Sequence, residues 1–174
     1  FKINELKVIP AFRYMRQFDN GAGKIGGANL KTKTVAYRDI DSLDSGLLGA
    51  RIDIAKREWK LRLGFTHIED KADLVAPWRG FPTGGFTRAM SQYNWFANTK
   101  SYMIRADYDF SKKQIIPGLK LMLRYVIQDF DDKKPGVQAD SNVLTLDLLK
   151  QFADYPNLYT KFRMGYVNGK SDTI

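Results

Sequence analysis

The sequence predicts an all-β fold of antiparallel meander hairpins, and three observations support that prediction. Apolar and polar residues alternate with a period of two through about seven segments of roughly 10 to 14 residues. The connections between these segments are alternately short and long. An arginine lies near the middle of almost every segment, on its polar face. Ordinary globular strands run to about five or six residues, so segments of this length favour strands that cross a lipid bilayer at a tilt.

The first three segments each have one apolar face. In residues 5–18 this face carries Leu6, Val8, Phe12 and Tyr14. In residues 46–57 it carries Leu48, Ala50, Ile52 and Ile54. In residues 59–68 it carries Trp59, Leu61, Leu63 and Phe65. Pro10 interrupts the first pattern, because a proline lacks the N–H of a ladder hydrogen bond and is tolerated mainly at edges or bulges.

The remaining four segments repeat the alternation. In residues 100–110 the apolar face carries Tyr102, Ile104, Ala106, Tyr108 and Phe110. In residues 118–129 it carries Leu119, Leu121, Leu123, Tyr125 and Ile127. In residues 158–168 it carries Leu158, Thr160, Phe162, Met164 and Tyr166. Residues 142–152, with Leu144, Leu146 and Leu148, are less regular and also allow a helix, since Leu149 and Lys150 follow directly.

The connections are sorted by length. The short ones are Glu58, 111–117 and 153–157, and the long ones are 19–45, 69–99 and 130–141. Short turns at one rim and long loops at the other are typical of outer-membrane barrels. The chain begins at Phe1 and ends at Ile174 without a closing aromatic strand end. We therefore expect an incomplete antiparallel transmembrane β-barrel, one domain over residues 1–174, as a fragment truncated at both ends.

Composition agrees with this prediction. The chain carries 28 Lys and Arg against 19 Asp and Glu, a formal net charge of +9, which attracts anionic partners. It has no cysteine, which excludes disulfides and thiolate metal sites. No run approaches the roughly 18 apolar residues of a membrane helix. A barrel strand exposes only every second residue to lipid, so a mean hydropathy of −0.39 is compatible with a barrel wall.

The mid-strand arginines predict a wet lumen. An arginine facing lipid at the bilayer midplane costs about 2–4 kcal/mol, and six would exceed a typical stability of about 5–15 kcal/mol. We expect Asp53, Asp107 and Asp147 to pair with part of this row. The alternative is an ordinary antiparallel sheet whose outer face is solvated by arginines. The predicted solute path comprises Arg13, Arg51, Arg62, Arg105, Arg124, Arg163, Lys120 and Lys161.

The long connection contains a stretch rich in Gly, Pro and aromatic residues, Ala76–Met90. Loops of this length inside a compact domain are usually functional or disordered. We expect it to fold into the barrel mouth and narrow it, and the alternative is an extracellular cap. The predicted constriction residues are Trp78, Arg79, Phe81 and Arg88.

Other features point to no reaction. His67 is the single histidine, and nothing places it beside a nucleophile. Asp129, Asp131 and Asp132 allow a calcium site or a solvated acidic turn. Aromatic residues near strand ends, such as Trp59 and Phe130, allow interfacial girdles or ordinary core packing. We expect no enzymatic activity, no cofactor and no metal.

Three stretches resemble the OprD-type family of outer-membrane porins. They are Ala76–Met90 continued by Gln92-Tyr93-Asn94-Trp95, then 100–108, and 129–132 with 138–142. The resemblance covers most of the chain after about Ser45. It implies the C-terminal portion of a monomeric barrel of about 18 strands in the bacterial outer membrane, with inward-folded loops and a basic ladder along one wall.

The sequence and the resemblance together predict a porin for passive diffusion of small anionic or carboxylate-bearing solutes, such as amino acids, in contact with outer-membrane lipids and without nucleic acid. The alternative is a soluble basic β-sheet protein that binds nucleic acid or acidic ligands. Such a protein interleaves aromatic rings with cations on one face. In this sequence the apolar faces and the arginine faces are opposite each other.

Overall fold

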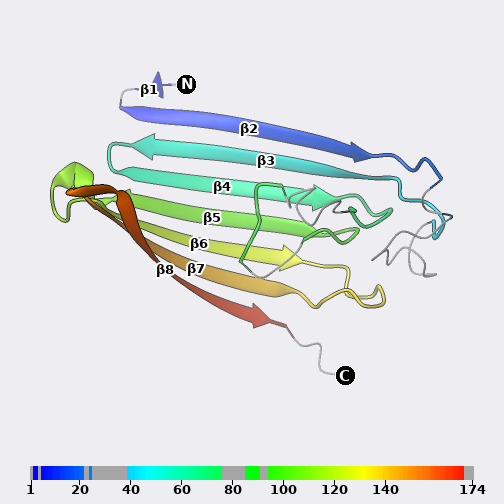
Figure 1. Ribbon diagram of the computed structural model, residues 1–174. Helices are drawn as coiled ribbons and strands as arrows, with labels where there is room; N and C mark the ends of the chain where they lie inside the picture. The colour runs from blue at the N-terminus through cyan, green and yellow to red at the C-terminus, as the bar shows by residue number, and fades with distance from the viewer. Residues whose placement is uncertain are drawn as a thin grey trace.

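The computed structural model describes residues 2–3, 5–21, 24, 39–75, 85–90 and 94–170. These residues form one antiparallel sheet in which each strand pairs with the next along the chain (Figure 1). The strands are β1 (Lys2–Ile3), β2 (Leu6–Gln17), β3 (Ser45–Lys56), β4 (Trp59–Ile68), β5 (Lys100–Asp109), β6 (Leu119–Asp129), β7 (Ser141–Phe152) and β8 (Tyr155–Gly169). A short 3-10 helix, η2 (Phe110–Lys113), follows β5.

The seven predicted strands are confirmed, with small differences at their ends. The structure adds the two-residue strand β1 at the start of the sheet. The segment that also allowed a helix is the strand β7. The turn expected over 153–157 is shorter, because β8 begins at Tyr155 and pairs with Phe152 next to a register shift. No helix of the described residues is long and apolar enough to cross a membrane.

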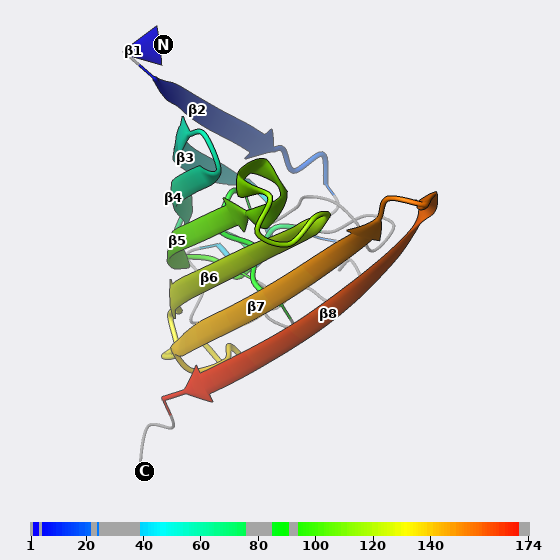
Figure 2. The ribbon, with the colours of Figure 1, turned by 90° about the vertical axis from the view of Figure 1, so that its left-hand side faces the viewer.

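The sheet is strongly curved and open (Figure 2). All short turns lie at one end of the strands and the long connections at the other (Figure 1). A strand twist accumulates across a sheet and bends it towards a barrel wall. The described part of the chain therefore has the shape of a segment of a barrel, with a convex and a concave face.

The convex face presents large apolar side chains outward. Leu123, Tyr125 and Ile127 on β6 are exposed, and so are their neighbours Tyr102 and Ile104 on β5. The register continues these apolar rows across the sheet, since Ile104 faces Tyr125 and Tyr102 faces Ile127. A contiguous exposed apolar surface of this kind marks contact with lipid or another apolar partner.

The buried side chains of the strands lie on the concave face, where residues 85–90 of the connection between β4 and β5 pack against the wall. Ala89 of this connection forms a cluster with Met103, Val126 and Val143 from three consecutive strands. A second cluster, near the long-loop rim, joins Leu47, Ile68 and Leu74. The core is therefore formed between the wall and its own folded-in connection, which positions residues 85–90 beside the arginine row.

Candidate functional site

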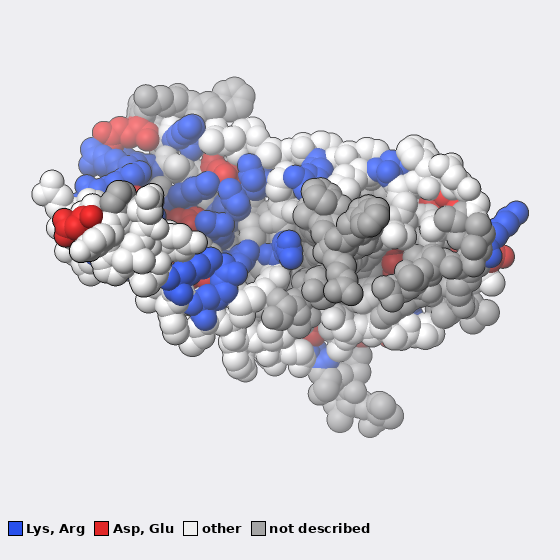
Figure 3. Space-filling view, viewed as in Figure 1, with Lys and Arg blue, Asp and Glu red and all other residues white. Residues whose placement is uncertain are grey.

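The candidate site is the concave face, where the strand register aligns the basic row. Arg62 on β4 faces Arg105 on β5, and Arg105 faces Arg124 on β6. Like charges placed directly opposite each other destabilise a sheet unless counter-charges or water compensate them. Viewed as in Figure 1, Lys and Arg side chains gather over the half of the sheet that carries the short turns (Figure 3).

Asp53 compensates the first arginine. Its carboxylate accepts two hydrogen bonds from Arg62, at 2.6 and 2.9 Å, in a bidentate pair. Lys60 Nζ lies 3.2 Å and Arg51 Nε 3.5 Å from the same carboxylate. Asp53 is only 3% exposed. One buried carboxylate thus holds three cations of the wall, and bidentate geometry fixes the direction of the Arg62 guanidinium.

Two further aspartates hold other members of the row. Asp107 accepts hydrogen bonds of 2.6 to 3.1 Å from Arg105 on the same strand. Asp147 accepts two bonds of 2.5 Å from Arg163, and Lys161 Nζ lies 3.2 Å away from it. The sequence predicted that Asp53, Asp107 and Asp147 pair with part of the row, and the structure identifies their partners. The row stays positively charged, because these three aspartates pair with only part of its eight Lys and Arg residues.

Arg124 differs from its neighbours. Its Nη1 donates to the carbonyl oxygen of Arg88 at 3.0 Å, whereas its Nε has no hydrogen-bond partner among the residues that the structure describes. No carboxylate in the described part of the chain forms an ion pair with it. An anion is attracted most strongly where a guanidinium keeps its full charge. Arg124 is therefore the position of the row best suited to an anionic group.

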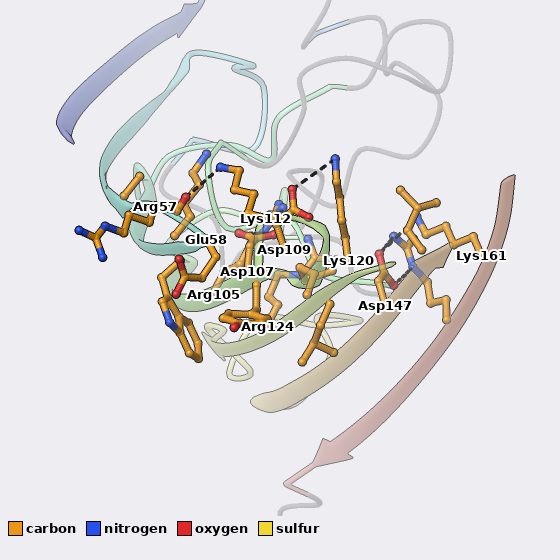
Figure 4. A pocket seen from close by; sticks show the side chains of 18 residues that line it. Arg57, Glu58, Arg105, Asp107, Asp109, Lys112, Lys120, Arg124, Asp147 and Lys161 are labelled. Atoms are coloured by element: carbon orange, nitrogen blue, oxygen red, sulfur yellow. Dashed lines mark hydrogen bonds and ion pairs between the residues drawn. The ribbon is translucent and has the colours of Figure 1, made fainter. Parts of the chain in front are cut away.

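A hollow of about 560 Å³ lies beside Arg124 at the short-turn end (Figure 4). Eight Lys and Arg side chains and four Asp and Glu side chains line it. Lys120, from β6, lies 3.8 Å from Asp109 there, and Lys161 and Arg163 enter from β8. The structure thus brings Arg105, Arg124, Arg163, Lys120 and Lys161 to one cationic hollow, while Arg62 lies on the same face beside Arg105.

Arg13 and Arg51 lie further along the concave face, over the ring of Phe86. Their Cζ atoms are 5.0 and 4.9 Å from the ring centroid, within the range of cation–π attraction. The eight predicted path residues therefore divide into the hollow, the Asp53 cluster and this aromatic contact. Their role in solute passage stays a prediction.

The constriction residues are described in part. Arg88 has an exposed side chain, and its backbone is bound to Arg124 on the concave wall. Trp78, Arg79 and Phe81 lie outside the described residues. Segment 85–90 nevertheless lies against the inner wall, because Ala89 is buried in the cluster with Met103, Val126 and Val143.

Sequence reasoning missed the glycines and the phenylalanine that shape this wall. Gly49 and Gly64 lie on the concave face, facing Arg13 and Arg51 across the strands. A side chain at either glycine would press against Phe86. Glycine within a strand often marks a close approach of another backbone. The two glycines could be recognised in the sequence, because they interrupt the polar faces of segments 46–57 and 59–68. The sequence did not indicate which residue approaches them.

The long-loop rim is fixed by an ion-pair cluster around Lys134, which is 4% exposed. Its Nζ binds Asp131 at 2.8 Å and also Asp70, from the connection after β4. Asp131 additionally accepts from Asn98 at 3.0 Å. The hydrogen bond from Lys134, followed by that from Asn98, lowers the pKa of Asp131. Burial opposes the charge of Lys134, but its bonds to Asp131 and Asp70 raise its pKa overall.

Asp131 belongs to the acidic turn for which the sequence allowed a calcium site, and here it forms an ion pair with Lys134. Among the residues that the structure describes, no group of three or more His, Cys, Asp or Glu side chains is placed to hold a metal ion.

Aromatic pairs lie near the strand ends, as in Trp59–Tyr108, with ring centroids 4.4 Å apart, and Phe96–Phe130, at 6.0 Å. The first pair is on the convex side, where Trp59 is exposed, and Phe130 is buried.

No protein-family model and no curated protein matches the sequence. Solved structures do match in fold. OccK5 (OpdH) of Pseudomonas aeruginosa superposes with a TM-score of 0.75 at 17% identity over 97% of this chain and 42% of that chain. OpdL of the same species gives 0.73 at 22% identity, over 97% and 43%. OccAB3 of Acinetobacter baumannii gives 0.76 at 20% identity, over 97% and 40%.

The chain spans about two fifths of the length of these solved structures, which are OprD/Occ-type porins. Its open meander of antiparallel strands corresponds to part of their β-barrel wall. The fold of this chain is therefore that of a segment of an OprD/Occ-type porin β-barrel.

Proposed function

We propose that the full-length protein is a bacterial outer-membrane porin that lets small carboxylate-bearing anions diffuse along the arginine row. One observation carries the proposal: apolar side chains are exposed on the convex face, while the guanidinium groups lie on the concave face of the same strands. In this proposal, Ile104 on β5 and Tyr125 on β6, which face each other, contact lipid, while the facing pair Arg105 and Arg124 lines the lumen. A water-filled lumen lined by arginines favours anions.

The aspartates support a path rather than a tight binding site. Asp53, Asp107 and Asp147 neutralise part of the row at short range, so an anion meets alternating attraction and repulsion along the wall. Conduction requires sites that are favourable enough to enter and weak enough to leave. Carboxylates fit the planar fork of the guanidinium, so organic acids and amino acids are the solute class that we propose.

The test is the reversal potential of the full-length protein in planar bilayers across a potassium chloride gradient, repeated with potassium acetate. We expect anion selectivity in the wild type. Arg105→Gln, which leaves Asp107 without its partner, and Arg124→Gln should both shift the reversal potential towards cations. The matched control is Lys100→Gln, which removes one positive charge from an exposed position on β5 outside the basic row. Cation selectivity of the wild type, or equal shifts in all three variants, would refute the arginine path.

The alternative, a soluble sheet that binds nucleic acid, predicts a protein that is soluble without detergent, whereas a porin requires detergent or lipid. A single-strand reader stacks bases on aromatic rings set among its cations. Here the exposed rings of Tyr102, Tyr125 and Phe162 lie on the convex face, away from the arginine row. Monomeric behaviour of the refolded full-length protein in buffer without detergent would favour that alternative.

A further inference from the structure

Phe86 occupies a place on the concave wall where two arginines face two glycines. Arg13 on β2 faces Gly49 on β3, and Arg51 on β3 faces Gly64 on β4. A Cβ at Gly49 would lie 3.3 Å from Phe86 Cδ2, and a Cβ at Gly64 would lie 3.3 Å from the carbonyl oxygen of Phe86. Both distances are tighter than ordinary van der Waals contact. The two glycines therefore form a seat for this residue.

The backbone is held in the same seat. Phe86 N donates to Thr66 Oγ1 at 3.2 Å, and Thr66 is fully buried beneath it. Gly85 adopts a φ of +60°, and a Cβ there would lie 2.5 Å from Thr66 Oγ1. Only glycine combines that backbone conformation with so close an approach. The position of Phe86 is thus set by contacts to β3 and β4 together.

The ring brings two cations of the row together. Arg13 and Arg51 both lie within 5.0 Å of its centroid, measured from Cζ. The negative π face of a phenyl ring attracts guanidinium groups and offsets their mutual repulsion. Both arginines thus contact the folded-in segment through this ring, and Arg51 also lies 3.5 Å from Asp53.

We propose that Phe86 is a positioning residue that latches segment 85–90 onto the barrel wall through Arg13 and Arg51, and thereby sets the width of the pore beside the arginine row. This inference rests on the proposed porin function. Loss of the two cation–π contacts should shift the ratio of docked to released segment by on the order of tenfold. Because Phe86 carries no charge, its replacement should change the conductance more than the ion selectivity.

The first experiment records single channels of the full-length protein with Phe86→Leu and Phe86→Trp. We expect Phe86→Leu to add a more conductive level or to raise the mean conductance, with the reversal potential nearly unchanged. Phe86→Trp keeps the π face and should retain the wild-type level. Phe162→Leu makes the same change on the exposed convex face and should have no effect. A Phe86→Leu channel identical to wild type would overturn the latch.

A double-mutant cycle tests the partners. In an Arg13→Gln/Arg51→Gln background, Phe86→Leu should add little to the conductance, because its partners are already gone. A full additional effect of Phe86→Leu in that background contradicts the cation–π mechanism. The reversal potential separates the two roles of the arginines, which are contact with Phe86 and positive charge in the lumen. Replacing the arginines alters the charge of the lumen, whereas replacing Phe86 does not.

A second readout does not depend on channel activity. This chain has no cysteine, so a nitroxide attached at Arg88→Cys, in a full-length protein without other cysteines, reports the mobility of segment 85–90. Phe86→Leu should increase the mobile fraction, and Phe86→Trp should not. An unresponsive label overturns the latch. A responsive label in a protein that forms no channels supports the latch and refutes the porin function.

Discussion

Two arginine substitutions at the same depth, one on each face of β6, distinguish a barrel wall from a water-soluble sheet by their effects on stability. Leu123 lies at the middle of the apolar face of β6, which extends from Leu119 to Ile127, and it is 44% exposed. At about 3.4 Å per residue this face is roughly 27 Å long, and at a strand tilt of about 40° it spans about 21 Å of the apolar band of about 25 Å in outer-membrane barrels. The adjacent Met122 points to the concave face, where Asp107 and Asp147 flank it across the strands.

We expect Leu123→Arg to destabilise the full-length protein in lipid vesicles by about 2–4 kcal/mol, the cost of arginine at the bilayer midplane. That is roughly a 30- to 900-fold change in the folding equilibrium. Met122→Arg avoids this cost of charge in lipid and should destabilise the protein less than Leu123→Arg, through the packing lost by a residue that is 8% exposed. The new guanidinium would lie at the cationic hollow, between Asp107 and Asp147 on the neighbouring strands.

The assay is reversible urea or guanidinium unfolding of the two variants and the wild type in vesicles of one composition. A surface substitution in water usually changes stability by no more than about 0.5 kcal/mol. A Leu123→Arg effect of that size, or a larger effect at Met122 than at Leu123, would refute the assignment of the convex face to lipid.

Three further predictions concern charge, pH and backbone geometry. Asp53→Asn should increase anion selectivity and cost about 1–3 kcal/mol in an unfolding titration, because it leaves a cluster of cations without its shared acceptor. The pKa of Asp131 is lowered, so its pair with Lys134 contributes fully above the unfolded pKa of about 3.9 and is lost as the pH falls through the lower folded value. Hydrogen-exchange protection factors of residues 131–137 should therefore be constant from neutral pH to about 5 and fall below about 4, and Asp131→Asn should remove that dependence. Gly118→Ala should cost at least about 2 kcal/mol in chemical unfolding, since Gly118 has a φ of +73° and its Cβ would collide with the β7 backbone, whereas Gly169→Ala meets open space and should cost less than half as much.

The strands were predictable because alternation is a local property. The side chains of Leu121, Leu123 and Tyr125 must point to one side of any strand that contains them. Arg124 must then point to the other side. Its chemistry also restricts the choice of face, because a guanidinium in hydrocarbon is costly. Both arguments need only the sequence of one segment, and the structure agrees with them.

The turn after β7 and the seat of Phe86 could not be predicted in the same way. The residues Tyr155-Pro156-Asn157 have the composition of a turn, yet β8 already starts at Tyr155 because it pairs with Phe152. Gly49 and Gly64 were visible as glycines on polar faces. Their partner, Phe86, lies more than twenty residues further along the chain, in a connection whose folding direction no periodicity encodes.

The amino-acid sequence by itself determined the strands, their two faces and the excess of cations on one of them, since these properties follow from local alternation and from the cost of placing charge in lipid. The tertiary structure decided which charges meet. Cross-strand register aligned Arg62, Arg105 and Arg124, gave Asp53 to Arg62, and left Arg124 without an ion-paired carboxylate among the described residues. Register and loop docking join residues that are distant along the chain, so they depend on the energy of the whole sheet rather than on any one segment.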